Sequence, residues 1–404
     1  MESDSSTTST SEDSEGIFYG SSEVVKAVVI DAGTATIRAG FADDDTPSVI
    51  IPPVVGRAKT PAGSSLEPGL KSIYVGTEAV SKRGVLDQLR NPIEHGLVTN
   101  WDDMELLWKH TFQELGVKSE GQPVLLTETE RVPKADREKT VQIMFEQFET
   151  PSLNISTQSV LALYESGRTT GVVVHVGEGS SHTVPILEGH RIRHAILKMS
   201  VSGSDLTAYL SKLLTSHPEN YGQDLRSYYT RELVRGYKEK MCYVALDFNN
   251  ELSSAKSADS EQNLEGLEMP DGTEVTLTKS DRIKVPEALF DPTLCGYEEP
   301  GIHWSLHSSI HKLNCDIWLD LYRNIVLAGG STLVPRLAAR LEREVDKLAK
   351  AGKRHVKVVP ATGLHTSWRG GTILASLTTF KDMYINREEY EEAGPGIVHR
   401  KCFE

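Results

Sequence analysis

The stretch VVKAVVIDAGTATIRAGF, residues 24–41, decides how this chain of 404 residues folds. Its first half packs β-branched residues into an apolar run that is typical of a strand buried on both faces, and Gly33 ends that run. The following residues, ATIRAGF, alternate enough to form a returning strand. The stretch therefore predicts a hairpin whose first strand ends in Asp31 and a sharp glycine turn.

The same arrangement of an apolar strand breaking into glycines occurs twice more along the chain. It is found in GVVVHVGEG at 171–179 and in NIVLAGGST at 324–332, and the second of these leads into a helical pattern. The units at 24–41 and 171–179 indicate two related halves that face each other. Because strands alternate with helices, the sequence predicts an α/β architecture with ligands at the glycine-rich strand ends.

Apolar spacing between these units predicts several helices. Helices fit 205–217 and 229–246, and another is expected from about Asn154 until Gly167 stops it. The acid- and Ser-rich segment 253–265 is interpreted as a surface excursion with little chemistry.

The chain begins with MESDSSTTSTSEDSEG, which contains no basic residue and little to bury. Ordering such a run costs backbone entropy without compensating burial, so residues 1–22 are predicted to be a disordered acidic Ser/Thr-rich tail. A phosphorylation-tuned or partner-binding arm is the alternative interpretation. The Gly-, Pro- and Ser-rich stretch 58–70 is expected to be an exposed loop.

Composition excludes several classes of function. Lys and Arg total 43 against 57 for Asp and Glu, and the resulting charge of -14 disfavours direct binding of nucleic acid or of an anionic membrane. No stretch approaches the roughly 18 apolar residues of a spanning helix, and no secretory signal pattern is present, so an intracellular protein is expected. The four cysteines form no C-x-x-C pair, which disfavours a disulfide framework and a cysteine zinc site.

Three glycine-marked turns could direct backbone N–H groups at one anion: 31–38, 177–181 and 329–332. Each turn by itself is more simply a hairpin or a helix entry. Their order along the chain, with two hairpins and then a strand that leads through Gly-Gly-Ser into a helix, suits a nucleotide held between two lobes. The chain has no P-loop, no G-x-G-x-x-G and no H-E-x-x-H or G-x-S-x-G motif, which disfavours the commonest alternatives.

Many collinear stretches resemble actins and actin-related proteins over nearly everything after Val24. The longest are AGFADDDTP, PIEHGLVTNWDDME, PVLLTE, REKTVQIMFEQF, SGRTTGVVV, HTVPILEGH, KEKMCYVALDF, LAGGST, GGTILASL and GPGIVHRKCF. The resemblance implies an actin-like ATPase fold of four subdomains in two lobes, with ATP or ADP and Mg²⁺ or Ca²⁺ in the cleft. It places the first lobe at 23–165, with 358–404 returning to it, and the second at 166–357.

The resemblance also implies a role for individual residues. Asp31 would orient metal-bound water, Gln158 would position the attacking water, and His182 would belong to the same water network. The nucleotide would be held by Asp31, Gly33, Thr34, Ala35 and Arg38 of the first hairpin, by Gly177, Glu178 and Gly179 of the second, by Arg235, Lys238 and Glu239 of a helix, and by Gly329, Gly330 and Ser331 of the third turn. Without the resemblance, Gln158 and His182 would be read as buried polar side chains, and Arg235 with Glu239 as a surface ion pair.

His175 departs from the family pattern, which carries an aspartate at this place, and Glu178 also replaces a usual aspartate. An imidazole cannot supply the negative charge that polarises the attacking water, and the loss is expected to slow hydrolysis by about 10² to 10⁴. The alternative is that His175 is tolerated by pairing with Asp31 or a phosphate oxygen, so that weak turnover remains.

These features predict an actin-like structural protein of the cytoplasm and cytoskeleton that binds ATP, hydrolyses it slowly or not at all and polymerises poorly by itself. Expected partners are actin or actin-binding proteins, together with some self-association, and neither nucleic acid nor membrane. The alternatives are a competent ATPase that forms filaments and a nuclear scaffold subunit of a chromatin-modifying complex.

Overall fold

The structure, a computed structural model, describes residues 25–59, 71–217, 227–259, 265–269, 272, 274–349 and 355–402. The expected tail at 1–22 and most of the expected loop, residues 60–70, lie outside these ranges. Within them, no helix is both long enough and apolar enough to span a membrane.

The described chain is a mixture of helices and strands. The strands are β1 (Val28–Ala32), β2 (Ile37–Phe41), β3 (Val49–Ile51), β4 (Val55–Ala58), β5 (Ile73–Val75), β6 (Leu86–Arg90), β7 (Ile93–Glu94), β8 (Leu97–Val98), β9 (Val124–Glu128), β10 (Ser152–Thr157), β11 (Gly171–Val176), β12 (Ser181–Leu187), β13 (His190–Arg191), β14 (Leu197–Met199), β15 (Glu265–Glu268), β16 (Glu274–Leu277), β17 (Ile325–Ala328), β18 (Val358–Val359) and β19 (Ile385–Asn386). The α-helices are α1 (Gly76–Ser81), α2 (Trp101–Glu114), α3 (Lys134–Glu146), α4 (Gln158–Glu165), α5 (Gly203–Ser216), α6 (Tyr228–Met241), α7 (Phe248–Asp259), α8 (Lys279–Glu287), α9 (Ile302–His311), α10 (Trp318–Arg323), α11 (Leu337–Leu348), α12 (Thr366–Ser376), α13 (Arg387–Ala393) and α14 (Val398–Lys401).

The first large sheet has the order β19-β10-β9-β1-β2-β3. Strand β1 pairs antiparallel with β2, as the opening stretch predicts, and parallel with β9, which in turn pairs parallel with β10. Val28, Val29 and Ile30 are fully buried, because helices cover both faces of this central strand.

The second large sheet repeats this topology, with the order β13-β12-β11-β17-β18. Strand β11 forms an antiparallel hairpin with β12 and pairs parallel with β17, and β17 pairs parallel with β18. The two largest hydrophobic clusters of the described residues, one on each large sheet, bury most of the apolar side chains. The prediction of an α/β fold built from two related halves is therefore confirmed.

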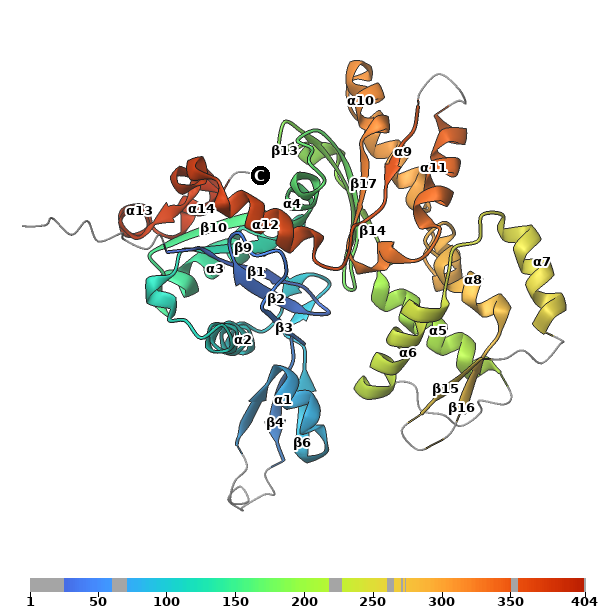
Figure 1. Cartoon of the computed structure of the whole chain (residues 1–404), viewed down its shortest axis with the longest axis horizontal. Helices are drawn as coiled ribbons and strands as arrows, with labels where there is room; N and C mark the ends of the chain where they lie inside the picture. The colour runs from blue at the N-terminus through green and yellow to red at the C-terminus, as the bar shows by residue number, and fades with distance from the viewer. Residues whose placement is uncertain are drawn as a thin grey trace, which may run out of the picture.

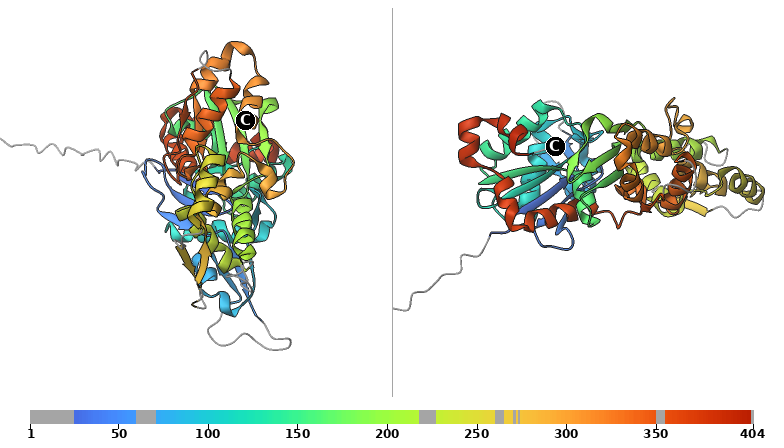
Figure 2. Two further views of the ribbon diagram at one scale, coloured as in Figure 1. Left: turned by 90° about the vertical axis from the view of Figure 1, so that its right-hand side faces the viewer. Right: turned by 90° about the horizontal axis from the view of Figure 1, so that it is seen from above.

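The two sheets lie side by side along the long axis of the molecule (Figure 1). The C-terminal helices α12 to α14 return to the first half, and the small sheet of β4 to β6 with α1 projects below it (Figure 1). Seen from the side, the molecule is much narrower than in the first view (Figure 2). Helices α4 and α12 pack so closely that a Cβ atom on Gly370 would lie 1.9 Å from the carbonyl oxygen of Leu161.

Two expectations about elements need correction. Residues 152–157 form β10 instead of the start of a helix, since they pair with β9 and β19, and only Gln158 begins the helix. Helix α6 ends at Met241, because the amide of Val244 bonds to Pro335 of another segment. The segment expected to be a surface excursion contains the second half of α7, and its residues 260–264 lie outside the described ranges.

The chain leaves the second sheet after β18. Strand β18 pairs with β17, and the side chain of Thr362 donates a hydrogen bond to Glu165 at the end of α4. Residues 358 and 359 therefore belong to the second sheet.

Candidate functional site

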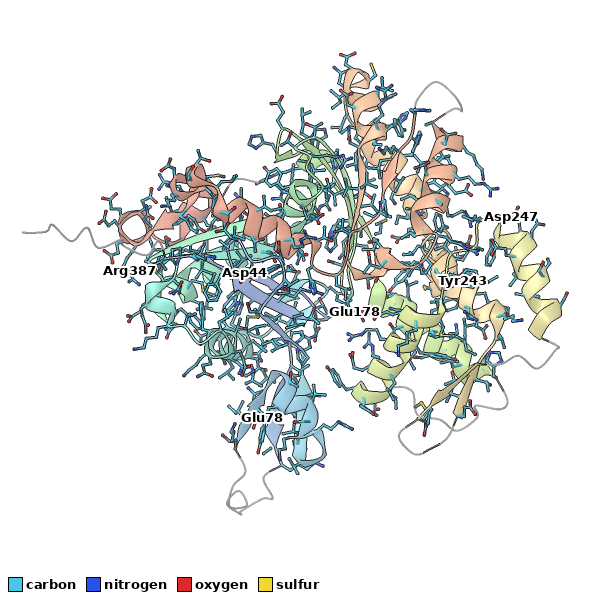
Figure 3. All side chains as sticks on the ribbon, in the orientation of Figure 1. Asp44, Glu78, Glu178, Tyr243, Asp247 and Arg387 are labelled. Carbon is cyan, nitrogen blue, oxygen red and sulfur yellow. The ribbon has the colours of Figure 1, made fainter. Side chains whose placement is uncertain are left out.

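All three glycine-marked turns meet in one cavity between the two large sheets. The cavity is lined by most of the site residues that the sequence predicted, namely Asp31, Gly33, Thr34, Ala35, Arg38, Gln158, His175, Gly177, Glu178, Gly179, Arg235, Glu239, Gly329, Gly330 and Ser331. Glu178 marks this position between the halves in Figure 3. The cavity thus brings together residues from both hairpins, from helices α4 and α6 and from the turn after β17.

Asp31 at the end of β1 is the most constrained acid of the cavity, with 3% of its surface exposed. Its Oδ1 accepts hydrogen bonds from Thr127 Oγ1 at 2.6 Å and from Gln158 Nε2 at 2.8 Å. Its Oδ2 accepts from Arg38 Nη1 at 3.3 Å. These three donors hold the carboxylate in one orientation, which a site that positions water requires.

The tips of the two hairpins approach each other across the cavity. A Cβ atom on Gly179 would lie 2.4 Å from Thr34 Oγ1, so only glycine permits this approach. Thr34 is fixed from the other side, because its carbonyl accepts a hydrogen bond of 2.7 Å from Asn91 Nδ2. The two hairpins are therefore held at a separation that a side chain at 179 would not allow.

Helix α5 supports the second hairpin. The amides of Gly203 and Ser204, at the start of this helix, donate hydrogen bonds of 2.8 Å to the carbonyls of Gly177 and Glu178. The third turn packs against the same hairpin, because Gly329 adopts a φ of +88° and a Cβ there would lie 2.4 Å from the carbonyl oxygen of Val176. Burial raises the pKa of the Glu178 carboxyl, opposed by the nearby Lys238 and arginine charges.

Two histidines stand opposite each other on the second hairpin, His175 on β11 and His182 on β12. Burial lowers the pKa of His175, against the opposing charges of Glu130 and Asp31. Burial, assisted by the neighbouring His175, lowers the pKa of His182 to about 3. Both imidazoles are therefore neutral near pH 7, so His175 offers no charge of either sign to a ligand.

Two predicted residues lie outside the lining of the cavity. His182 is buried beside His175, on the neighbouring strand β12. Lys238 points its ammonium group to the start of α5, where Nζ donates hydrogen bonds of 2.8 Å to Gly203 O and to Thr207 Oγ1. Arg235 and Glu239 do line the cavity, and Arg235 also pairs with Glu232 at 2.6 Å.

Seven lining residues were missed by the sequence analysis, namely Thr36, Gly96, Thr129, Ser180, Leu364, Thr366 and Ser367. Thr36 and Ser180 belong to the predicted turns and could have been found by taking each turn as a whole. The segment 364–367 follows β18 and could have been found only by extending the strand-and-turn rule to a strand of two residues. Gly96 and Thr129 carry no local signal.

Comparison with known families agrees with this architecture. The family model for actin matches residues 22–403, nearly the whole chain. The chain belongs to the actin family, and the resemblance seen in the sequence is confirmed. Members of this family typically bind ATP with a divalent cation and hydrolyse it.

The donor set of the cavity fits such a nucleotide and its cation. Arg38 and Arg235 supply positive charge for phosphates, and the glycine turns allow close approach of the backbone. Among the described residues, no group of three or more His, Cys, Asp or Glu side chains could hold a metal ion. Asp31 is the buried carboxylate of the lining that could hold a cation through water.

Proposed function

We propose that this chain is an actin-like structural protein that binds ATP or ADP, with Mg²⁺ or Ca²⁺, in the cavity between its two sheets. The observation that carries the proposal is the convergence of three glycine turns on one cavity with a buried, three-times hydrogen-bonded Asp31. We assign the first lobe to residues up to 165 and again from 360, and the second to the residues between. A closed pair of lobes would be stabilised by any ligand that contacts both.

Each residue has a definite part in this proposal. The turn at 33–35 and the turn at 177–179 hold the phosphates from opposite sides, and Arg38 adds charge. When bound, the cation neutralises the phosphates. Asp31 would hold the cation through water, and Gln158, whose Nε2 donates to Asp31 Oδ1 at 2.8 Å, would orient the attacking water.

The direct test of binding is extraction of nucleotide from the purified protein, followed by titration with ATP and ADP. The proposal expects bound adenine nucleotide or tight uptake of it. A protein that is isolated empty and takes up neither nucleotide at millimolar concentration would overturn it.

We further propose that hydrolysis is impaired, because His175 is buried and neutral where the family carries an aspartate. His175→Asp should raise the rate of phosphate release by about 10² to 10⁴, since a carboxylate would restore polarisation of the attacking water. His175→Asn is the matched control, because it changes the ring without adding charge. Single-turnover phosphate release measures both variants.

Equal rates for the unchanged protein and His175→Asp would contradict the impaired site and favour the alternative of a competent ATPase. A similar acceleration in His175→Asn would show that the size of the ring, and not its missing charge, limits the reaction.

Weak self-assembly is the third part of the proposal. The loop 58–70 contains no methionine and two prolines, where an adaptable apolar contact would need flexible side chains, and the net charge of -14 adds repulsion. Purified protein at low micromolar concentration should stay in the supernatant after ultracentrifugation with Mg-ATP and salt. Quantitative pelleting under these conditions would contradict this part alone, and pelleting only with added actin would support copolymerisation.

A further inference from the structure

A second cavity, separate from the nucleotide site, is strongly basic. Its volume is about 360 Å³, within the range of roughly 300 to 1,000 Å³ of small-molecule sites. Six of its described lining residues can carry positive charge, namely Arg131, Lys134, Arg137, Arg191, Arg193 and His399, and the other two are apolar. In a chain with a net charge of -14, this concentration of cations runs against the overall balance.

Three distant segments build this cavity. Arg131, Lys134 and Arg137 come from the loop before α3 and from α3 itself, in the first half. Arg193 follows β13 in the second half, and His399 lies on α14. The Nη2 of Arg131 donates a hydrogen bond of 2.9 Å to the carbonyl of Ile196, so the cavity lies across the junction of the two halves.

Acids behind the cavity orient its deeper cations. Arg137 Nε donates to Glu128 Oε2 at 2.9 Å, and Arg191 Nη1 donates to Glu130 Oε2. Both arginines are buried, and neither acid is among the described lining residues. The guanidinium groups are thus fixed before a ligand arrives, which lowers the entropy lost on binding.

The outer cations are accessible. Arg131, Lys134 and Arg193 are exposed at the rim of the cavity, and no acid is among its described lining residues. A planar guanidinium binds two phosphate oxygens at once, and several of them around one cavity favour a ligand with several phosphate groups over one with a single carboxylate.

We propose that this cavity binds a small soluble polyphosphate, a compact molecule carrying two or more phosphate groups, and that the ligand bridges the two halves of the protein. Each half supplies cations, so the ligand favours one relative position of the halves.

Calorimetric titration of the full chain with inositol hexakisphosphate tests the site, with tripolyphosphate and inorganic phosphate as further probes. Each titration is made with and without saturating Mg-ATP. The two polyphosphates should bind in both conditions, more weakly as salt is raised, and inorganic phosphate should bind far more weakly. If Mg-ATP displaces the polyphosphate probe, the probe binds in the nucleotide cavity, and the proposal of a separate basic site is overturned. If the protein does not bind ATP, only the proposed nucleotide function is contradicted.

Variants at the rim locate the binding. The double variant Arg131→Gln with Arg193→Gln should have an affinity for inositol hexakisphosphate that is lower by a factor of at least about ten, because each substitution removes a charged donor. Lys109→Gln with Lys118→Gln, an equal loss of charge at exposed positions on and after α2, is the matched control and should leave the affinity unchanged. Equal affinities of the two double variants, or no binding by the unchanged protein, would overturn the site. If the rim double variant unfolds, Lys134→Gln alone serves the same comparison.

Discussion

At the residue scale, burial decides the protonation state of the two histidines of the second hairpin. His175 and His182 occupy opposite positions on β11 and β12, and both are less than one tenth exposed. Removing an imidazole from water disfavours its charged form, so the folded protein keeps both rings neutral at pH values where the unfolded chain protonates them. These two buried histidines therefore couple folding to pH.

This coupling gives a prediction for His182. Its folded pKa of about 3 lies below the usual 6.5, so the stabilisation is complete above pH 6.5 and is lost as the pH falls toward 3. Between pH 7 and pH 5, His182 should account for a decrease of about 2 kcal/mol in the free energy of unfolding. Urea titrations at both pH values measure the decrease. His182→Gln should reduce it, whereas His190→Gln, at an exposed position, should not, and equal decreases in all three proteins would contradict the prediction.

At the element scale, the start of α5 fixes the second hairpin. The amide and hydroxyl of Ser202 donate hydrogen bonds to Asp205 Oδ2 at 2.8 and 2.6 Å, forming a capping box. The next two amides, of Gly203 and Ser204, bind the carbonyls of the hairpin. The cap therefore holds both the helix and the loop that lines the cavity.

Ser202→Ala should lower the free energy of unfolding by about 1 kcal/mol. It should also lower the affinity for ATP, because the amides of Gly203 and Ser204, which hold the hairpin, lose the support of the cap. Asn386→Ala, which removes the cap of the remote α13, should cost a similar free energy without changing the affinity. Chemical unfolding and nucleotide titration compare the two variants. An equal effect of both on ATP would show that the α5 cap has no special part in the site.

At the scale of the whole molecule, α4 connects the halves at the base of the cavity, because its Ala162 and Leu163 pack with Val173 of β11 and Val326 of β17. Helix α12 ties α4 to the first sheet. The hydroxyl of Ser367 on α12 donates to the carbonyl of Gln158 at 3.2 Å, and the indole of Trp368 donates to Val29 of β1 at 3.1 Å. The first sheet, both helices and the cavity thus form one connected structure. A ligand between the halves should consequently stabilise the whole chain.

Mg-ATP at one hundred times its dissociation constant should raise the free energy of unfolding by about 2.7 kcal/mol, and removal of the cation with a chelator should reduce the gain. Thermal unfolding with ATP, with ATP and chelator, and without ligand measures both effects. Gly179→Ala, whose Cβ would meet Thr34 Oγ1 at 2.4 Å, should show a smaller gain. No shift with Mg-ATP would contradict a nucleotide site between the halves.

Local patterns were sufficient for some elements and not for others. The hairpins beginning at Val28 and Gly171 were predictable, because β-branched runs and glycine turns have strong local preferences. Strand β10 was mistaken for a helix, because its pairing with β9 and β19 comes from residues distant in the chain. The position of Lys238 was missed for the same reason, since its partners lie on α5.

The sequence by itself determined the α/β class, the three glycine turns and the family, because these depend on neighbouring residues and on their order. Only the tertiary structure decided that the turns share one cavity, that His175 is neutral and that a basic cavity spans the two halves. Burial and the meeting of Arg131, Arg193 and His399 are properties of the packed chain, in which residues far apart in sequence become neighbours.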